Sequence, residues 1–179
     1  MAPVPIDDSG ARAVQETVTF DKLFVGACDI AADASDEALV EFFEIARTAD
    51  FIKEKEAQRV CLQFPDELLF CAARVTHLLE ALLPEAQISV LGDTSHGACC
   101  ADEVAAEHAD AQVLIHYGNA CLSPTRRLPT LYVFGRKKVP ETTTCDSLSA
   151  LIGDTFAESS ERVMVLHDLA LSYVASGVS

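Results

Sequence analysis

The sequence predicts an α/β fold, a three-layer arrangement in which a parallel sheet of about four strands has helices flanking it. Short apolar runs alternate along the chain with longer segments whose apolar residues recur every three or four positions. This alternation is typical of parallel strands joined by right-handed crossover helices. Half of the 179 residues are hydrophobic, which is ample for a buried core.

The first elements follow from composition and periodicity. Residues 1–20 mix Pro, Asp and Ser without periodicity, and we expect them to form a mobile arm. Residues 35–56 predict a helix that begins at Ser35, a residue type favoured as an N-terminal cap. Its apolar stripe comprises Leu39, Phe42, Phe43, Ala46 and Ala49.

Strands and helices then alternate. Pro65 and Asp66 end the first predicted strand and open the next helix, and Pro84 ends that helix. The predicted strands cover residues 59–64, 87–92, 112–116 and 130–134, and the predicted helices cover residues 66–83 and 99–109.

The rest of the chain carries weaker patterns. Residues 135–144 are typical of a linker, 145–160 of a helix and 162–167 of another strand. That strand either joins the sheet or begins a second domain. The sequence therefore predicts a mobile arm at 1–20, an α/β domain at 21–140, and a linker with the start of a second, incomplete domain at 141–179.

Charge and cysteine content narrow the function classes. The chain has 13 Lys and Arg against 28 Asp and Glu, a net charge of −15, which argues against nucleic acid and anionic membrane as partners. We expect no secretory or membrane-spanning segment, because no apolar run approaches the ~20 residues that a spanning helix needs. Seven Cys is an odd number, which favours free thiols in a reducing compartment, hence the cytoplasm.

Three cysteines follow predicted strand ends. Cys99 and Cys100 come after the second predicted strand and Cys121 after the third. Ligands gather at the carboxyl ends of parallel strands, so these thiols could reach one metal ion or cluster if the two strands are neighbours. Gly97 permits a close backbone approach, and a helix beginning at the cysteines would favour the thiolate form that binds metal.

Other interpretations remain beside this one. Cysteine is often simply buried, no CxxC pair is present, and Cys28, Cys61 and Cys71 are expected to be core or chance residues, not ligands. His96 and His116 fall on the same rim and keep zinc open, although His116 is as well explained as a structural hydrogen-bonding residue.

No catalytic residue is assigned. Asp93, Asp102 and Glu103 could act as acids or bases, but the last two are expected to complement a helix dipole. His77 and His108 are expected at the surface. The sequence has no phosphate loop, no GxSxG elbow and no GxGxxG motif. Their absence argues against a nucleotide hydrolase, an esterase and a classical dehydrogenase.

Residues 91–124 (LGDTSHGACCADEVAAEHADAQVLIHYGNACLSP), preceded by residues 59–69 (RVCLQFPDELL), carry a resemblance to a known family. They resemble the diphthamide-biosynthesis proteins, which assemble the 2-(3-amino-3-carboxypropyl)histidine synthase. The resemblance runs from about residue 42 to residue 134. The DEVAAEHA stretch with ACLSP is more similar to the second eukaryotic subunit than to the first.

The resemblance implies three similar α/β domains around a [4Fe–4S] cluster that cysteines of different domains bind. It implies cleavage of S-adenosylmethionine to a 3-amino-3-carboxypropyl radical, which is added to a histidine of translation elongation factor 2. Two related subunits form a heterodimer in eukaryotes. The first carries the catalytic cluster, and the second supports it, including its reduction, for which a small electron-donor protein is expected.

Carried over by position, the resemblance implies Cys99, Cys100 and Cys121 as metal ligands, and the choice between the two adjacent cysteines stays open. His96 stands where the family usually has Tyr, and Ala101 stands where Val is common. Cysteines that the family takes from later domains are absent unless Cys145 substitutes for one.

The resulting hypothesis is the first domain of a non-catalytic synthase subunit that supports or reduces the cluster of its partner. Two alternatives stay open. One is a truncated binding module without a stable cluster. The other is a zinc-binding structural domain that uses Cys99, Cys100, Cys121 and His96.

Overall fold

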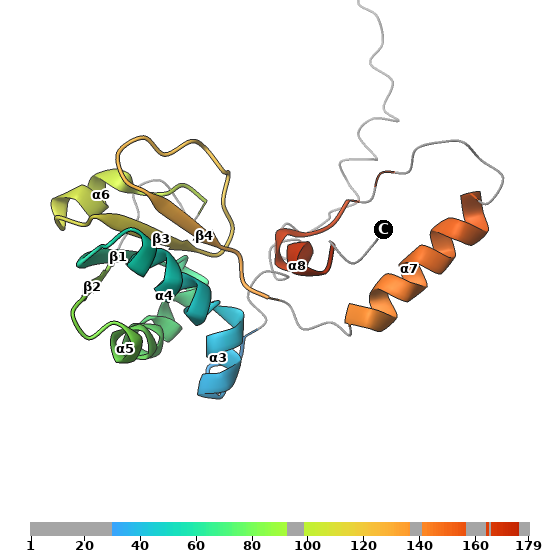
Figure 1. Cartoon of the computed structure of the whole chain (residues 1–179), viewed down its shortest axis with the longest axis horizontal. Helices are drawn as coiled ribbons and strands as arrows, with labels where there is room; N and C mark the ends of the chain where they lie inside the picture. Colours follow the sequence, from blue (N-terminus) through green and yellow to red (C-terminus); the bar gives the residue numbers. More distant parts are fainter. Residues whose placement is uncertain (1–29, 93–98, 137–140, 157–163, 165, 176–179) are drawn as a thin grey trace, which may run out of the picture.

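The computed structural model describes residues 30–92, 99–136, 141–156, 164 and 166–175. Within these residues the strands form one parallel sheet in the order β2-β1-β3-β4 (Figure 1). The strands are β1 (Arg59–Gln63), β2 (Gln87–Val90), β3 (Val113–Tyr117) and β4 (Thr130–Val133). The predicted four-strand parallel sheet is confirmed.

Helices cover both faces of this sheet, as Figure 1 shows. On one face lie α3 (Asp36–Phe42), α4 (Ile45–Glu54), the 3-10 helix η1 (Asp66–Cys71) and α5 (Ala72–Leu82), and on the other lies α6 (Glu103–His108). The larger core packs the first set of helices against alternate residues of the strands, including Val60, Leu62, Val113, Ile115 and Val133. The intervening residues Cys61 and Leu114 pack with Ala106 of α6.

The helix predicted over 35–56 is two helices. Ser35 does cap the first, because its hydroxyl accepts a hydrogen bond from the Ala38 amide at 3.3 Å. The chain then breaks at Glu44, which has a φ of 46°. Periodicity did not show the break because buried apolar residues stand on both sides of it, Phe43 before and Ile45 after.

The helix predicted to begin at the cysteines begins later. Asp102 is its N-cap and accepts a hydrogen bond from the Ala105 amide at 2.9 Å, so α6 starts at Glu103. Cys99 and Cys100 therefore precede the helix, and the predicted effect of its dipole on their thiolates is wrong. The helix predicted at 66–83 also differs. Its first six residues form the 3-10 helix η1, and the α-helix α5 begins after them at Ala72.

After the sheet, α7 (Glu141–Phe156) confirms most of the helix predicted at 145–160 and begins earlier, within the predicted linker. A short 3-10 helix η2 (Leu169–Leu171) and α8 (Ser172–Ala175) follow. Of the strand predicted at 162–167, the described residues Met164, Leu166 and His167 have no regular secondary structure. The rest of it, and the predicted arm at 1–20, lie outside the described residues.

None of the helices in the described part of the chain combines the length and the apolar character needed to cross a bilayer.

Candidate metal centre

The three predicted thiols converge beyond the carboxyl ends of the strands. The sulfur of Cys100 lies 3.7 Å from that of Cys99 and 3.7 Å from that of Cys121. All three sulfur atoms lie within 4.8 Å of one another. The predicted convergence is confirmed, although β2 and β3, which precede the two loops, are not neighbours: β1 lies between them.

The two cysteine loops join each other directly across the end of β1. The amide of Cys121 donates to the carbonyl of Cys99 at 2.9 Å. The segment that leads from β3 to Cys121 starts at Gly118. Its φ of 88° suits glycine, and a Cβ there would lie 2.9 Å from Cγ of Pro65. A glycine is therefore needed where the chain leaves β3 towards Cys121.

Two polar side chains hold the loops to the fold. Gln63, the last residue of β1, donates from Nε2 to the Cys100 carbonyl at 2.7 Å and accepts at Oε1 from the Asp102 amide at 2.9 Å. Glu103 accepts from the backbone amides of Arg126, Arg127 and Leu128 at 2.6 to 3.2 Å. Glu103 thus fixes the segment that follows Cys121, beyond the helix-dipole role that its sequence position predicts.

The thiols differ in proton affinity. The pKa of Cys121 falls to about 7, chiefly because the Ser123 hydroxyl, 3.1 Å from its sulfur, can donate to the thiolate. The pKa of Cys100 rises to about 11, chiefly because its single thiol proton is held in hydrogen-bond contact with the Cys121 sulfur, and next because of the contact with the Cys99 sulfur. Cys121 is therefore the first of this pair to become a thiolate, the form that binds metals.

The remaining candidate residues have structural surroundings. His116 is buried, its Nε2 donates to the Asn119 carbonyl at 3.0 Å, and burial lowers its pKa. His77 and His108 are exposed, as expected, and Asp102 caps α6. His96, Asp93 and Gly97 lie outside the described residues.

The other described cysteines stand apart from the thiol site. Cys61 and Cys71 are buried, and burial raises the pKa of Cys61 to about 11. Cys145 donates from its sulfur to the Val174 carbonyl at 3.6 Å and is not part of the thiol cluster. Cys28 lies outside the described residues.

Sequence reasoning missed Gln63 and Ser123. The signal for Gln63 was a polar side chain at the end of an apolar strand (RVCLQF), at a position that the fold buries. Ser123 gave no signal beyond its place two residues after Cys121.

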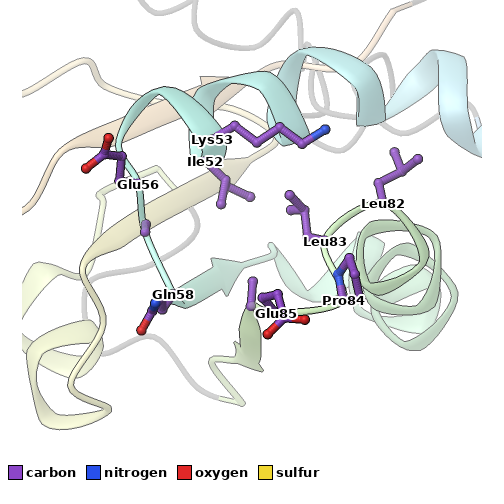
Figure 2. Close-up of a pocket in the computed structure, with 10 residues that line it drawn as sticks. Ile52, Lys53, Glu56, Gln58, Leu82, Leu83, Pro84 and Glu85 are labelled. Atoms are coloured by element: carbon purple, nitrogen blue, oxygen red, sulfur yellow. The ribbon is translucent and has the colours of Figure 1, made fainter.

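A pocket of about 280 Å³ lies at the opposite, amino end of the sheet, between the ends of α4 and α5 (Figure 2). Its residues precede β1 and β2, whereas the thiols follow β2 and β3. The pocket is therefore separate from the thiol site. It is lined by Ile52, Lys53, Glu56, Ala57, Gln58, Leu82, Leu83, Pro84, Glu85 and Ala86.

Among solved structures, a crystal structure of Dph2 from Pyrococcus horikoshii with a 4Fe-4S cluster is similar over 63% of this chain and 33% of that chain. The sequence identity is 21% and the TM-score is 0.48. A likeness this remote adds nothing to the geometry of the thiols.

Curated relatives are closer. A 2-(3-amino-3-carboxypropyl)histidine synthase subunit 2 from Xenopus laevis is 40% identical over 97% of this chain and 34% of its own length. The protein of the same name from Schizosaccharomyces pombe is 47% identical over 75% of this chain and 24% of its own length. The chain thus spans roughly a quarter to a third of these relatives.

The family model described as "Putative diphthamide synthesis protein" matches residues 64–177. The match begins at the carboxyl end of β1 and includes both cysteine loops, the rest of the sheet and the helices that follow. The chain therefore belongs to the diphthamide synthesis protein family.

Proposed function

We propose that this chain is the first domain of a synthase subunit acting in the first step of diphthamide biosynthesis. In that step a 3-amino-3-carboxypropyl group passes from S-adenosylmethionine to a histidine of elongation factor 2. The names of the curated relatives support the pathway. The chain's share in it is to support or reduce the iron–sulfur cluster of a catalytic partner subunit.

The observation that carries this proposal is the three-thiol cluster on the sheet rim. Thiolates of Cys99, Cys100 and Cys121 are the donor type that iron–sulfur clusters require, so the residues present fit the group. Such a cluster, when bound, supplies the low-potential electron that cleavage of a sulfonium needs. Ligands beyond this domain complete the set, in line with the chain's partial coverage of its relatives.

The two carboxylates that follow the cysteine pair in the described part of the chain, Asp102 and Glu103, are committed to the fold, which favours a supporting role over acid–base catalysis. Asp102 caps α6, and Glu103 is occupied by three backbone amides of the 126–128 segment. Backbone hydrogen bonds bring the pKa of Glu103 below its usual value, although burial acts in the opposite direction. Glu103 is therefore ionised at neutral pH and serves as an acceptor, not as a proton donor.

The proposed partners are the first synthase subunit in a heterodimer, elongation factor 2, and a small electron-donor protein. All of these place the chain in the cytoplasm. The cysteine rim, which leaves Cys99 and Cys121 exposed, is the surface expected to face the rest of the synthase.

The test is anaerobic reconstitution of the purified chain with iron and sulfide, followed by absorption and electron paramagnetic resonance spectra. We expect a cluster signal that a Cys99→Ser, Cys100→Ser, Cys121→Ser triple variant loses. Cys71→Ser is the control, because this cysteine is buried in the main core away from the rim. A folded wild-type chain that takes up neither iron nor any other metal would favour a binding module instead.

Two sulfur–sulfur distances favour a second candidate, a single tetrahedral zinc ion. With Zn–S bonds of about 2.3 Å, tetrahedral geometry places two thiolate sulfurs about 3.8 Å apart. The Cys99–Cys100 and Cys100–Cys121 sulfur distances are both 3.7 Å, whereas a cluster binds its thiolates on separate iron atoms. Metal analysis of the chain purified without added iron distinguishes the two, because stoichiometric zinc that iron does not displace would support the structural site.

A further inference from the structure

We propose that Gln63 is the positioning residue of the thiol site, and this inference rests on the proposed metal-binding function. Its side chain is buried, with 1% of its surface exposed. It contacts no sulfur atom in any described hydrogen bond, and instead holds the backbone on both sides of Ala101, at the Cys100 carbonyl and the Asp102 amide. Gln63 thereby sets where the Cys100 sulfur can lie.

The position of β1 explains why this residue holds the site. β1 is the strand between β2 and β3, from which the two cysteine loops leave. Its backbone ladder to the β2 side ends where Leu62 accepts a hydrogen bond from the Leu91 amide at 2.9 Å. Two residues after the end of β1, Pro65 caps η1 and the backbone leaves the sheet. The Gln63 amide side chain continues the pairing by one step, donating and accepting as a further backbone unit would.

Only an amide of this length makes both contacts. One end must donate to the Cys100 carbonyl and the other must accept from the Asp102 amide. A methionine of similar volume makes neither contact, and a glutamate carboxylate keeps only the acceptor. Because Gln63 is buried, its loss leaves backbone groups without partners, and the loop must move to reach water.

The thiol site has one more internal connection, the hydrogen bond from the Cys121 amide to the Cys99 carbonyl. That bond ties the two loops to each other. Gln63 ties the Cys100 loop to the sheet, and Glu103 holds the segment that follows Cys121. Loss of Gln63 should therefore spread the three sulfurs while the sheet stays folded. Closeness of the thiols is then the property to measure, and it can be measured without any metal.

The first arm uses the metal-free chain with Cys99→Ser, which leaves one defined pair at the rim. Diamide oxidises Cys100 and Cys121 to a disulfide, and its N=N bond takes up the two electrons and two protons to become a hydrazine. Peptide mapping follows the bond. We expect Gln63→Met to slow its formation at least 5-fold and Gln63→Glu to give an intermediate rate, in line with the number of contacts kept.

Leu62→Val is the matched control. Leu62 is the neighbour of Gln63 in β1 and is fully buried on the opposite face, so its truncation lowers stability without touching the loops. Thermal unfolding is recorded for each variant. Disulfide formation in Gln63→Met at the parent rate, or equal slowing by Leu62→Val, would overturn the proposal. If Gln63→Met does not fold, the rate in Gln63→Glu decides.

The second arm titrates the chain carrying all its cysteines with Co²⁺ and follows the sulfur-to-cobalt charge-transfer absorption. Gln63→Met should weaken Co²⁺ binding about 10-fold, the lower end of what outer-shell changes cost, and Leu62→Val should not. If the parent binds neither Co²⁺ nor iron, the proposed metal role fails while the diamide arm still decides the part played by Gln63.

Discussion

Cys121 and Cys100 hold protons with very different affinity although their sulfurs lie 3.7 Å apart. The cause is the direction of the hydrogen bonds. The Ser123 hydroxyl can donate to the Cys121 thiolate, whereas the proton of Cys100 is held between the neighbouring sulfurs. Near neutral pH Cys121 therefore loses its proton while Cys100 keeps its own, and a metal must displace the proton of Cys100 to bind both.

Alkylation of the metal-free chain should show this order. Because the pKa of Cys121 is lowered to about 7, its rate of reaction with iodoacetamide should rise between pH 6 and 8 and then level off. Cys100, with a pKa of about 11, should react slowly across that range. Mass spectrometry of the labelled peptides measures both rates.

Ser123→Ala provides the control for that experiment, because it removes the hydroxyl and leaves the thiol. The midpoint of the Cys121 profile should move towards the ordinary cysteine value, and Ser123→Thr should restore it. An unchanged midpoint in Ser123→Ala would show that the hydroxyl does not stabilise the thiolate.

His116 should make folding stability depend on pH. Burial lowers its pKa below the ordinary histidine value of 6.5, so the unfolded chain takes up a proton that the folded chain does not. The free energy of unfolding is therefore unaffected by protonation of His116 above about pH 6.5. It falls as the pH drops from there towards the lower pKa of the folded state. Urea unfolding at several pH values measures this decline. His116→Gln keeps a donor for the Asn119 carbonyl without titrating, and should flatten the decline.

Cys61 tests whether the site is confined to the rim. Cys61→Ser buries a hydroxyl between the sheet and α6, and we expect a loss of about 1–3 kcal/mol in the free energy of unfolding. Iron and Co²⁺ binding should persist in the folded variant. Loss of metal binding with intact circular dichroism would show that Cys61 belongs to the site.

Among the elements, the turn after β3 has the strictest backbone requirement. Gly118 combines a positive φ with a close approach to Pro65 at the start of η1. Gly118→Ala should lower the free energy of unfolding by at least about 1–2 kcal/mol, because alanine disfavours the left-handed conformation. The close contact with Pro65 adds to this loss. Thermal unfolding checks the loss. Gly153→Ala in α7 is the matched control, since a Cβ there meets nothing within 4 Å and stability should not fall.

The elements also show how far the sequence predicts the fold and the site. Residues 59–63 and 113–117 were predictable as strands because they are apolar and end at polar or turn residues. The break at Glu44 was not, because the buried apolar residues Phe43 and Ile45 continue the pattern across it. The thiols were predictable from their place after strands, whereas strand order and the contacts of Gln63 arise only when distant segments pair.

At the scale of the whole molecule, the chain spans only 34% of the Xenopus laevis relative and 24% of the Schizosaccharomyces pombe one. The parts of those relatives that lie beyond the match are candidates for the remaining ligands and for the apolar shell that controls solvent access to a metal. The exposed Cys99 and Cys121 agree with a site that another surface completes.

We therefore expect this chain alone to lack transferase activity. The assay combines the chain anaerobically with labelled S-adenosylmethionine, a reductant and purified elongation factor 2, with and without the first subunit. Label should reach the factor only when the first subunit is present. Stoichiometric labelling by this chain alone would contradict the proposed division of roles.

The adjacency of Cys99 and Cys100, with sulfurs 3.7 Å apart, has a consequence for how a metal would leave. Two donors on consecutive residues act as one chelating arm, and Cys121 acts as a second, monodentate arm on a separate loop. Exchange with a competing thiol would begin at Cys121, because the chelating arm keeps the ion at high local concentration and favours rebinding. Release would then proceed in two kinetic steps, with a partly detached intermediate from which the ion could pass to another protein.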